Sequence, residues 1–335
     1  MKLRSTTLPV PAALAAFAAL ALLACSSTPV ATDGGALPDG GSSPDSGSSL
    51  DSSVAEVGAD AAAPGSSYDV EYVQVGAGLV VGKSTLQLRL KARASGAPAP
   101  GLADSIAVAP LMTMPMMKHG APVPADAVKE SSTPGTYDVT LFFPMASVDD
   151  KGGAMGQWSL GVAVGAQAQA TLDLMVSPPK GADTTHKALQ SDADKMMSMG
   201  KPTNRKYMLF RDRLSTSASG AELGLFLSTI QEGGMVWPPV VPGLQLKDMN
   251  GAPQLAIAGV EVVGSTDGIT WTPMPCDARA RCAATLPGLR AGVTANAYVK
   301  LKVNGRDYTT DGASPDGKPE PTMTNAFATF AVTPP

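Results

Sequence analysis

Methionine and histidine are concentrated in one short stretch of this 335-residue chain. Residues 111–120 read Leu-Met-Thr-Met-Pro-Met-Met-Lys-His-Gly, and a further methionine precedes Gly-Gln-Trp at 156–158. Thioether sulfur is a soft, neutral ligand that suits Cu(I), and an imidazole beside it lets a site also hold Cu(II). We therefore expect copper as the cofactor, and the candidate metal ligands are Met114, Met116, Met117, His119 and Met155.

Core packing is the competing interpretation of these residues. Methionine often fills gaps in hydrophobic cores, and if residues 112–116 are extended, Met112, Met114 and Met116 share one face and can pack beneath Trp158. His119 would then follow the end of the strand, and it is the more informative residue because the chain has only two histidines. A copper site requires sulfurs and imidazole to converge at the surface, whereas packing requires buried sulfurs.

The methionine-rich stretch lies among short segments in which apolar and polar residues alternate, and these segments are expected to form the β-strands that hold it in place. Strands are predicted where apolar and polar residues alternate between turn-forming residues, as at Leu86, Leu88 and Leu90, which should all face inward. The predicted strands cover residues 68–75, 84–93, 106–112, 136–143, 157–164 and 168–176. Several short strands separated by turns predict an immunoglobulin-like β-sandwich over residues 67–177.

Three motifs occur in order within this region: Met-Pro-Met-Met-Lys-His-Gly, then Pro-Gly-Thr-Tyr-Asp-Val, then Met-Gly-Gln-Trp-Ser-Leu. In this order and spacing they resemble the YtkA-like/FixH-like family of exported β-sandwich domains. The resemblance implies copper handling outside the cytoplasm, or support of copper-oxidase assembly. The chain departs from the family pattern at residues 147–153, where a polar loop separates Met145 and Met155, two possible ligands.

The start of the chain has the features of an export signal. Lys2 and Arg4 precede an apolar run at 10–24 that is too short for a convincing membrane span. Leu-Leu-Ala-Cys at 22–25 resembles a bacterial lipobox, which predicts a lipoprotein signal peptide at 1–24 and a lipid on Cys25 that binds the membrane. An ordinary secretory signal is the alternative. Ser after the cysteine favours the outer membrane if the organism has two membranes.

Composition changes sharply after the predicted cleavage point. Residues 25–66 are rich in Ser, Gly, Asp, Ala and Pro and poor in large apolar residues, so we expect a disordered tether. Residues 178–204 are polar and predict a connector with a short helix at 187–199. On that helix Met196 and Met199 would share a face, either for docking or as a second soft-metal site.

The last region, residues 205–335, predicts a second β-sandwich-like domain and hence an all-β chain. Asn304-Gly305 predicts a type I′ hairpin turn. Cys276 and Cys282 are separated by five residues, and in an exported protein a disulfide between them is expected.

The net charge of −4 and the lack of a basic cluster argue against nucleic acid as a partner. No His-Glu-x-x-His, phosphate-binding glycine loop or Ser/His/Asp set can be assembled, so no enzyme is predicted. We expect a lipid-anchored cell-envelope protein that binds copper and acts with an envelope protein or copper protein. The alternative is a metal-free structural or protein-interaction lipoprotein with its methionines in the core.

Overall fold

Antiparallel β-strands supply nearly all the regular structure, which confirms the all-β prediction. The computed structural model describes residues 63, 65–76, 78–179, 181–217, 219–319, 322 and 324–335. The predicted signal peptide, Cys25 and the tether as far as residue 62 lie outside the described residues. Within the described part of the chain, no helix has the length and apolarity needed to cross a membrane.

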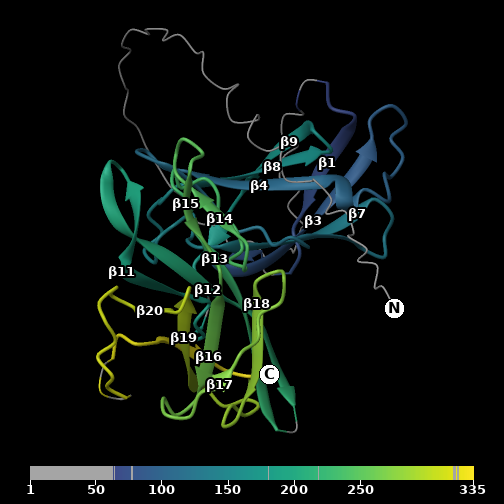
Figure 1. Cartoon of the computed structure of the whole chain (residues 1–335). Coiled ribbons are helices and arrows are strands. Elements are labelled where there is room, and N and C mark those ends of the chain that lie inside the picture. Colours follow the sequence, from purple (N-terminus) through teal and green to yellow (C-terminus); the bar gives the residue numbers. More distant parts are fainter. Residues whose placement is uncertain are drawn as a thin grey trace, which may run out of the picture. The chain divides into compact units, whose positions relative to one another are not determined.

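The first sandwich consists of two four-stranded sheets (Figure 1). One has the order β1 (Tyr68–Val73), β3 (Gly82–Ala92), β7 (Thr136–Phe143) and β6 (Val128–Glu130). The other has the order β5 (Lys118–Gly120), β4 (Ile106–Thr113), β8 (Gln157–Val164) and β9 (Gln167–Leu174). A short parallel pair, β2 (Leu79–Val80) and β10 (Val176–Ser177), and a 3₁₀ turn at Ala103–Ser105 complete it.

Strand periodicity explains the core of this sandwich. Leu86, Leu88 and Leu90 on β3 are fully buried, as their alternation predicted, and Trp158 and Leu160 on β8 face them from the other sheet. Because successive side chains of a strand point to opposite faces, the intervening polar residues lie outward. The alternation in the sequence therefore identified the inward face of each of these strands.

The second sandwich follows directly in the chain. One sheet has the order β11 (His186–Ser198), β12 (Lys201–Ser217), β13 (Gly220–Thr229) and β18 (Arg281–Leu286). The other has the order β17 (Thr272–Pro273), β16 (Val260–Ser265), β19 (Ala295–Val303) and β20 (Arg306–Tyr308), and β21 (Ala328–Val332) also pairs with β19. β14 (Gln245–Lys247) and β15 (Pro253–Ala256) form a separate hairpin.

The helix predicted at 187–199 is wrong. These residues form most of β11, which pairs along β12 from His186 opposite Phe210 to Ser198 opposite Lys201. Leu189 and Met196 on this strand are buried, so tertiary packing overrides the local helix signals. The predicted grouping of Met196 with Met199 on a helix face is lost with the helix.

Two other predictions for this region are confirmed. Asn304 and Gly305 both have positive φ, of 52° and 74°, and they connect Val303 to its partner Arg306 as a type I′ turn requires. Cys276 and Cys282 form a disulfide with an S–S distance of 2.00 Å.

The two sandwiches contact each other within the single unit that contains them. Phe142 lies on the outer face of β7 and stacks on Phe226 of β13, with ring centroids 4.5 Å apart. The Gly120 N–H donates to the Gly234 carbonyl at 3.0 Å, so the loop between β13 and β14 lies against β5. This loop forms part of the surroundings of His119.

Candidate metal centre

Strand register brings His119 into a row of large side chains. His119 on β5 lies opposite Met112 on β4, Met112 lies opposite Trp158 on β8, and Trp158 lies opposite Leu174 on β9. Directly paired residues share a face of the sheet. The row faces the core, because Met112 and Trp158 are fully buried and only 8% of His119 is exposed.

The histidine is therefore placed differently from the prediction. It lies within β5 instead of past a strand end, and its ring points toward the interior of the first sandwich. The ring meets Trp158 edge-on, with centroids 5.2 Å apart and planes at 89°. Its two nitrogens contact the Gly120 carbonyl at 2.9 Å and the Met145 sulfur at 2.8 Å.

Hydrogen-bonding chemistry determines which ring nitrogen carries the proton. A carbonyl oxygen only accepts, so His119 Nδ1 must donate to Gly120. Burial lowers the pKa of His119, which favours the neutral ring. Nε2 then carries a lone pair that faces Met145 Sδ, and a thioether sulfur is itself an acceptor.

Two electron-pair donors thus face each other across a short distance. Bonds of about 2.0 Å to nitrogen and 2.3 Å to sulfur that meet at a tetrahedral angle place the two ligand atoms about 3.5 Å apart. The 2.8 Å separation of Nε2 and Sδ is shorter than this, so an ion bound to both atoms requires the Met145 side chain to move outward. A soft cation bound to both atoms would turn a repulsive contact into two bonds.

Met145 is held where it can make this contact. It follows β7 on the opposite sheet, and its backbone carbonyl accepts a hydrogen bond of 3.1 Å from Trp158 Nε1. Its side chain is half-buried against the core. The sequence analysis named Met145 as a possible ligand. Its contact with His119 arises only because the two sheets pack together, and the spacing of residues in the sequence does not predict such packing.

The predicted methionine ligands lie at the end of the same sheet. β4 ends at Thr113, and a turn closed by Met114 N–H donating to the Met117 carbonyl follows it. Met114 packs against the core, whereas Met116, with 85% of its surface exposed, and Met117 face solvent. Met155 is exposed just before β8. Among the described residues, the hydrogen-bonding and aromatic contacts of the His119 ring are with Gly120, Met145 and Trp158 and include none of these four methionines.

Gly156 creates the space for two of the methionines. A Cβ at this position would lie 2.7 Å from Met112 Cε and 2.7 Å from Met114 Cγ. The absence of a side chain therefore lets both thioether chains fold over the start of β8. The Met-Gly-Gln-Trp motif at 155–158 owes its glycine to this close approach.

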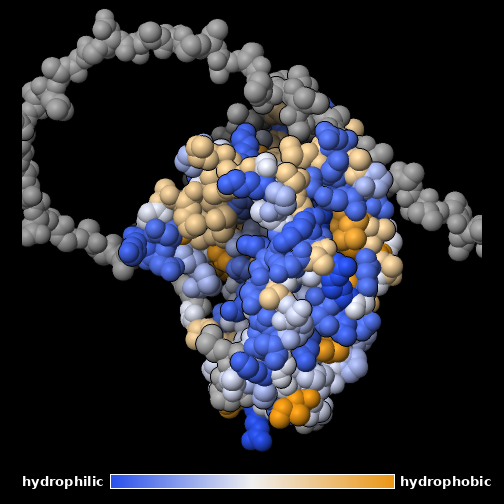
Figure 2. All heavy atoms as spheres, turned by 60° about the vertical axis from the view of Figure 1, so that its left-hand side comes forward, coloured by the Kyte–Doolittle hydropathy of each residue, from blue (hydrophilic) through white to orange (hydrophobic). Residues whose placement is uncertain are grey.

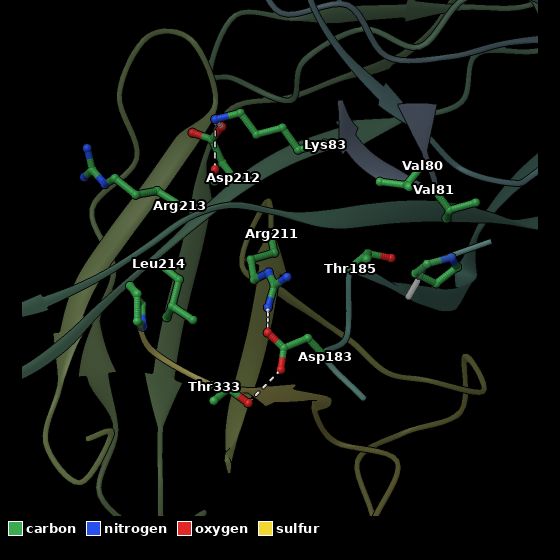
Figure 3. Close-up of a pocket in the computed structure, with 12 residues that line it drawn as sticks. Val80, Val81, Lys83, Asp183, Thr185, Arg211, Asp212, Arg213, Leu214 and Thr333 are labelled. Atoms are coloured by element: carbon green, nitrogen blue, oxygen red, sulfur yellow. Dashed lines mark hydrogen bonds and ion pairs between the residues drawn. The ribbon is translucent and has the colours of Figure 1, made fainter. Parts of the chain in front are cut away.

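A second feature is a cavity of about 410 Å³ beside β3, β12 and the end of the chain (Figure 3). Its charged side chains are already paired, either with each other or, for Arg213, with Glu222 outside the cavity. Arg211 donates to Asp183 at 2.5 Å, Asp183 also accepts from Thr333, and Lys83 contacts Asp212 at 2.8 Å. Because these charges are neutralised locally, the cavity is a weaker candidate site than the His119 cluster.

In the described part of the chain, no three side chains of His, Cys, Asp or Glu gather closely enough to hold a metal ion. No protein-family model matches the chain, and no curated protein matches it. The resemblance of the first sandwich to the YtkA-like/FixH-like family stays a prediction.

Proposed function

We propose that the first sandwich binds Cu(I) through His119 Nε2 and Met145 Sδ, and that the protein handles copper at the cell envelope. Met112 is a further thioether on the same face of the sheet, since it lies opposite His119. The export signal, the lipobox at Cys25 and the family resemblance support this location and role. A copper protein or another envelope protein is then the partner that gives or receives the ion.

One observation carries the proposal: the lone pair of a neutral, buried imidazole faces a thioether sulfur at 2.8 Å. A histidine that only packs in a core normally satisfies both ring nitrogens with a donor and an acceptor. Here Nδ1 has its acceptor in the Gly120 carbonyl, and Nε2 faces a second acceptor. The exposed Met116, Met117 and Met155 offer weaker thioether contacts for an arriving ion at the same end of the sheet.

The test is anaerobic titration with Cu(I) against a competing chelator. The protein is used without its signal peptide and with Cys25→Ser, so that it is soluble. We expect binding tighter than micromolar, and a loss of about tenfold or more, equivalent to about 1.4 kcal/mol, in His119→Ala and in Met145→Leu. Met274→Leu is the matched control, because Met274 is equally apolar but lies in the core of the second sandwich.

A specific observation also favours the metal-free alternative. Met112 is fully buried, and the edge-on contact of His119 with Trp158 is a packing interaction of the kind found in cores. On this alternative, the His119 and Met145 variants lose stability without any effect on a copper titration. Binding no tighter than micromolar, or binding unchanged in both variants, rejects the copper proposal.

A further inference from the structure

Methionine accounts for most of the large apolar side chains that reach solvent. Among the described residues, twelve large hydrophobic side chains are exposed, and eight of these belong to methionine. The other four belong to valine or isoleucine, and none belongs to leucine or to an aromatic residue. The exposed methionines are Met116, Met117, Met155, Met175, Met197, Met199, Met235 and Met249. Leucine and methionine have similar volumes and replace each other readily in apolar positions, so the feature that distinguishes these eight positions is the sulfur atom.

The eight exposed methionines are distributed over both sandwiches. They occupy the turn after β4, the positions before β8 and between β9 and β10, the hairpin of β11 and β12, and the loops on either side of β14. On the face of the molecule in Figure 2, strongly hydrophobic residues reach the surface only in small, separate patches. A metal site or a docking surface needs side chains that converge, whereas a reaction that modifies one sulfur at a time does not.

Other side chains that oxidants attack are withdrawn from solvent. Cys276 and Cys282 are already oxidised to a disulfide. Trp158 and Tyr137 are fully buried, and no tryptophan or tyrosine of the described chain is exposed. Four further methionines are buried, namely Met112, Met196, Met208 and Met274. In the described part of the chain, an oxidant that arrives from solvent therefore meets exposed thioethers before any other sulfur that it can oxidise.

Met199 shows that local stability does not explain an exposed methionine. Its φ of 50° lies in the left-handed region, which is unfavourable for most side chains other than those of glycine, asparagine and aspartate. Its side chain is 74% exposed, so burial does not compensate for the backbone conformation. A methionine at this position therefore suggests a role for its sulfur in solvent.

We propose that the eight exposed methionines react with hypohalous acids, and that the protein serves as a reversible sink for such oxidants. With hypochlorous acid, the sulfur displaces hydroxide from chlorine, and water then replaces chloride on the sulfur. The net change adds one oxygen to the sulfur and releases chloride and a proton, so sulfur loses two electrons and chlorine gains two. Methionine sulfoxide reductases reverse the change, with two thiols oxidised to a disulfide and one water released.

The position of these methionines makes their oxidation compatible with the fold. A sulfoxide is polar, and in a core it disrupts packing. On the surface the same group is hydrated, so it adds no unpaired polar atom to the interior. The eight sites together thus consume eight molecules of oxidant while the packing of both sandwiches is kept. The reaction uses neither His119 nor Met145 and does not depend on copper binding.

The test is a titration of the metal-free protein with hypochlorous acid. The protein lacks its signal peptide and carries Cys25→Ser, and excess free methionine stops the reaction before peptide mapping by mass spectrometry. We expect each exposed methionine to be oxidised at least about tenfold faster than Met112, Met196, Met208 and Met274. Protein that has gained eight oxygens should keep its melting temperature and its circular dichroism spectrum.

A second measurement asks whether the protein protects another one. The wild type is mixed with an enzyme that oxidation of a methionine inactivates, and the hypochlorous acid needed to inactivate half of the enzyme is compared with that for a variant with all eight exposed methionines changed to glutamine. Glutamine is polar and lacks sulfur, so this variant should fold but protect several-fold less. Met208→Leu with Met274→Leu is the matched control, because it removes only buried sulfurs and should protect as well as the wild type.

Three results overturn the proposal. They are equal oxidation rates for exposed and buried methionines, unfolding of the protein once the eight sites carry oxygen, and equal protection by the wild type and the glutamine variant. None of these measurements involves copper, so their failure leaves the site at His119 and Met145 untouched. Conversely, absence of Cu(I) binding at that site does not change the result expected here.

Discussion

His119 is buried, and its Nε2 atom faces an acceptor instead of a donor. The burial makes the stability of the protein depend on pH. The pKa of this histidine in the folded protein is below its usual value of 6.5. As the pH falls below 6.5, the unfolded chain binds a proton that the folded chain does not, so the free energy of unfolding decreases. The decrease continues to the folded pKa, with a limiting slope of about 1.4 kcal/mol per pH unit.

We expect His119→Asn to make the free energy of unfolding less dependent on pH. The slope should fall by up to about 1.4 kcal/mol per pH unit, which corresponds to one proton. Chemical denaturation of the metal-free protein between pH 5 and 8 measures it. His186→Asn is a positive comparison. Burial also lowers the pKa of His186, so this substitution should remove a similar contribution to the pH dependence. A pH dependence that is the same in the wild type and in His119→Asn contradicts the placement of His119 in the interior.

Gly156 leaves the space that the side chains of Met112 and Met114 occupy. We expect Gly156→Ala to destabilise the protein by about 1–3 kcal/mol, because the new methyl group overlaps Met112 and Met114. Urea denaturation measures the loss. Gly161→Ala on the same strand is the control, since a Cβ there would meet only ordinary contacts at 3.7 and 3.8 Å. Equal effects of the two changes would argue against a special role for Gly156.

At the scale of elements, the hairpin of β11 and β12 contains a strained residue. Met199 has a φ of 50° in the two-residue turn between Ser198 and Lys201. Side chains other than glycine, asparagine and aspartate are unfavourable there. We expect Met199→Asn to raise the free energy of unfolding by about 1 kcal/mol, measured by denaturation. Ser198→Asn, at the neighbouring strand position, should give no such gain, and a matching gain would refute the explanation.

The same hairpin shows what sequence can and cannot predict. Strands such as β7 and β8 were predicted to the residue, because their alternation was strong and their flanking turns were clear. β11 was predicted as a helix, because its methionine spacing and capping residues are local signals and its pairing with β12 is not. The candidate site failed to follow from sequence for the same reason: Met145 reaches His119 across two sheets, and the turn carries Met116 and Met117 outward.

At the scale of the whole molecule, the two sandwiches share apolar and charged contacts. Phe142 leaves the core of its own sandwich and joins that of the other, against Phe210 and Phe226. Arg281 of β18 donates to Asp126, before β6, at 2.7 Å, and to Asp212 of β12 at 3.1 Å. The hydrogen bond from Gly120 N–H to the Gly234 carbonyl adds a polar contact between the two sandwiches next to His119.

A substitution at Phe142 can show whether contacts between the two sandwiches make them unfold together. It is fully buried, and its ring lies outside the core of its own sandwich. We expect Phe142→Ala to cost about 3–5 kcal/mol and to separate thermal unfolding into two transitions, because it removes packing between the sandwiches. Differential scanning calorimetry distinguishes this from a simple loss of stability.

Phe330→Ala is the matched control for this experiment. Phe330 is equally buried but lies on β21, within the second sandwich. Phe330→Ala should lower the melting temperature of the second sandwich without changing the contacts between the two sandwiches. If Phe142→Ala and Phe330→Ala give the same single, shifted transition, the two sandwiches are coupled mainly by the polar contacts of Arg281. The Gly234 loop would then stay in place when the aromatic contact is lost, and Cu(I) binding at His119 should survive in Phe142→Ala.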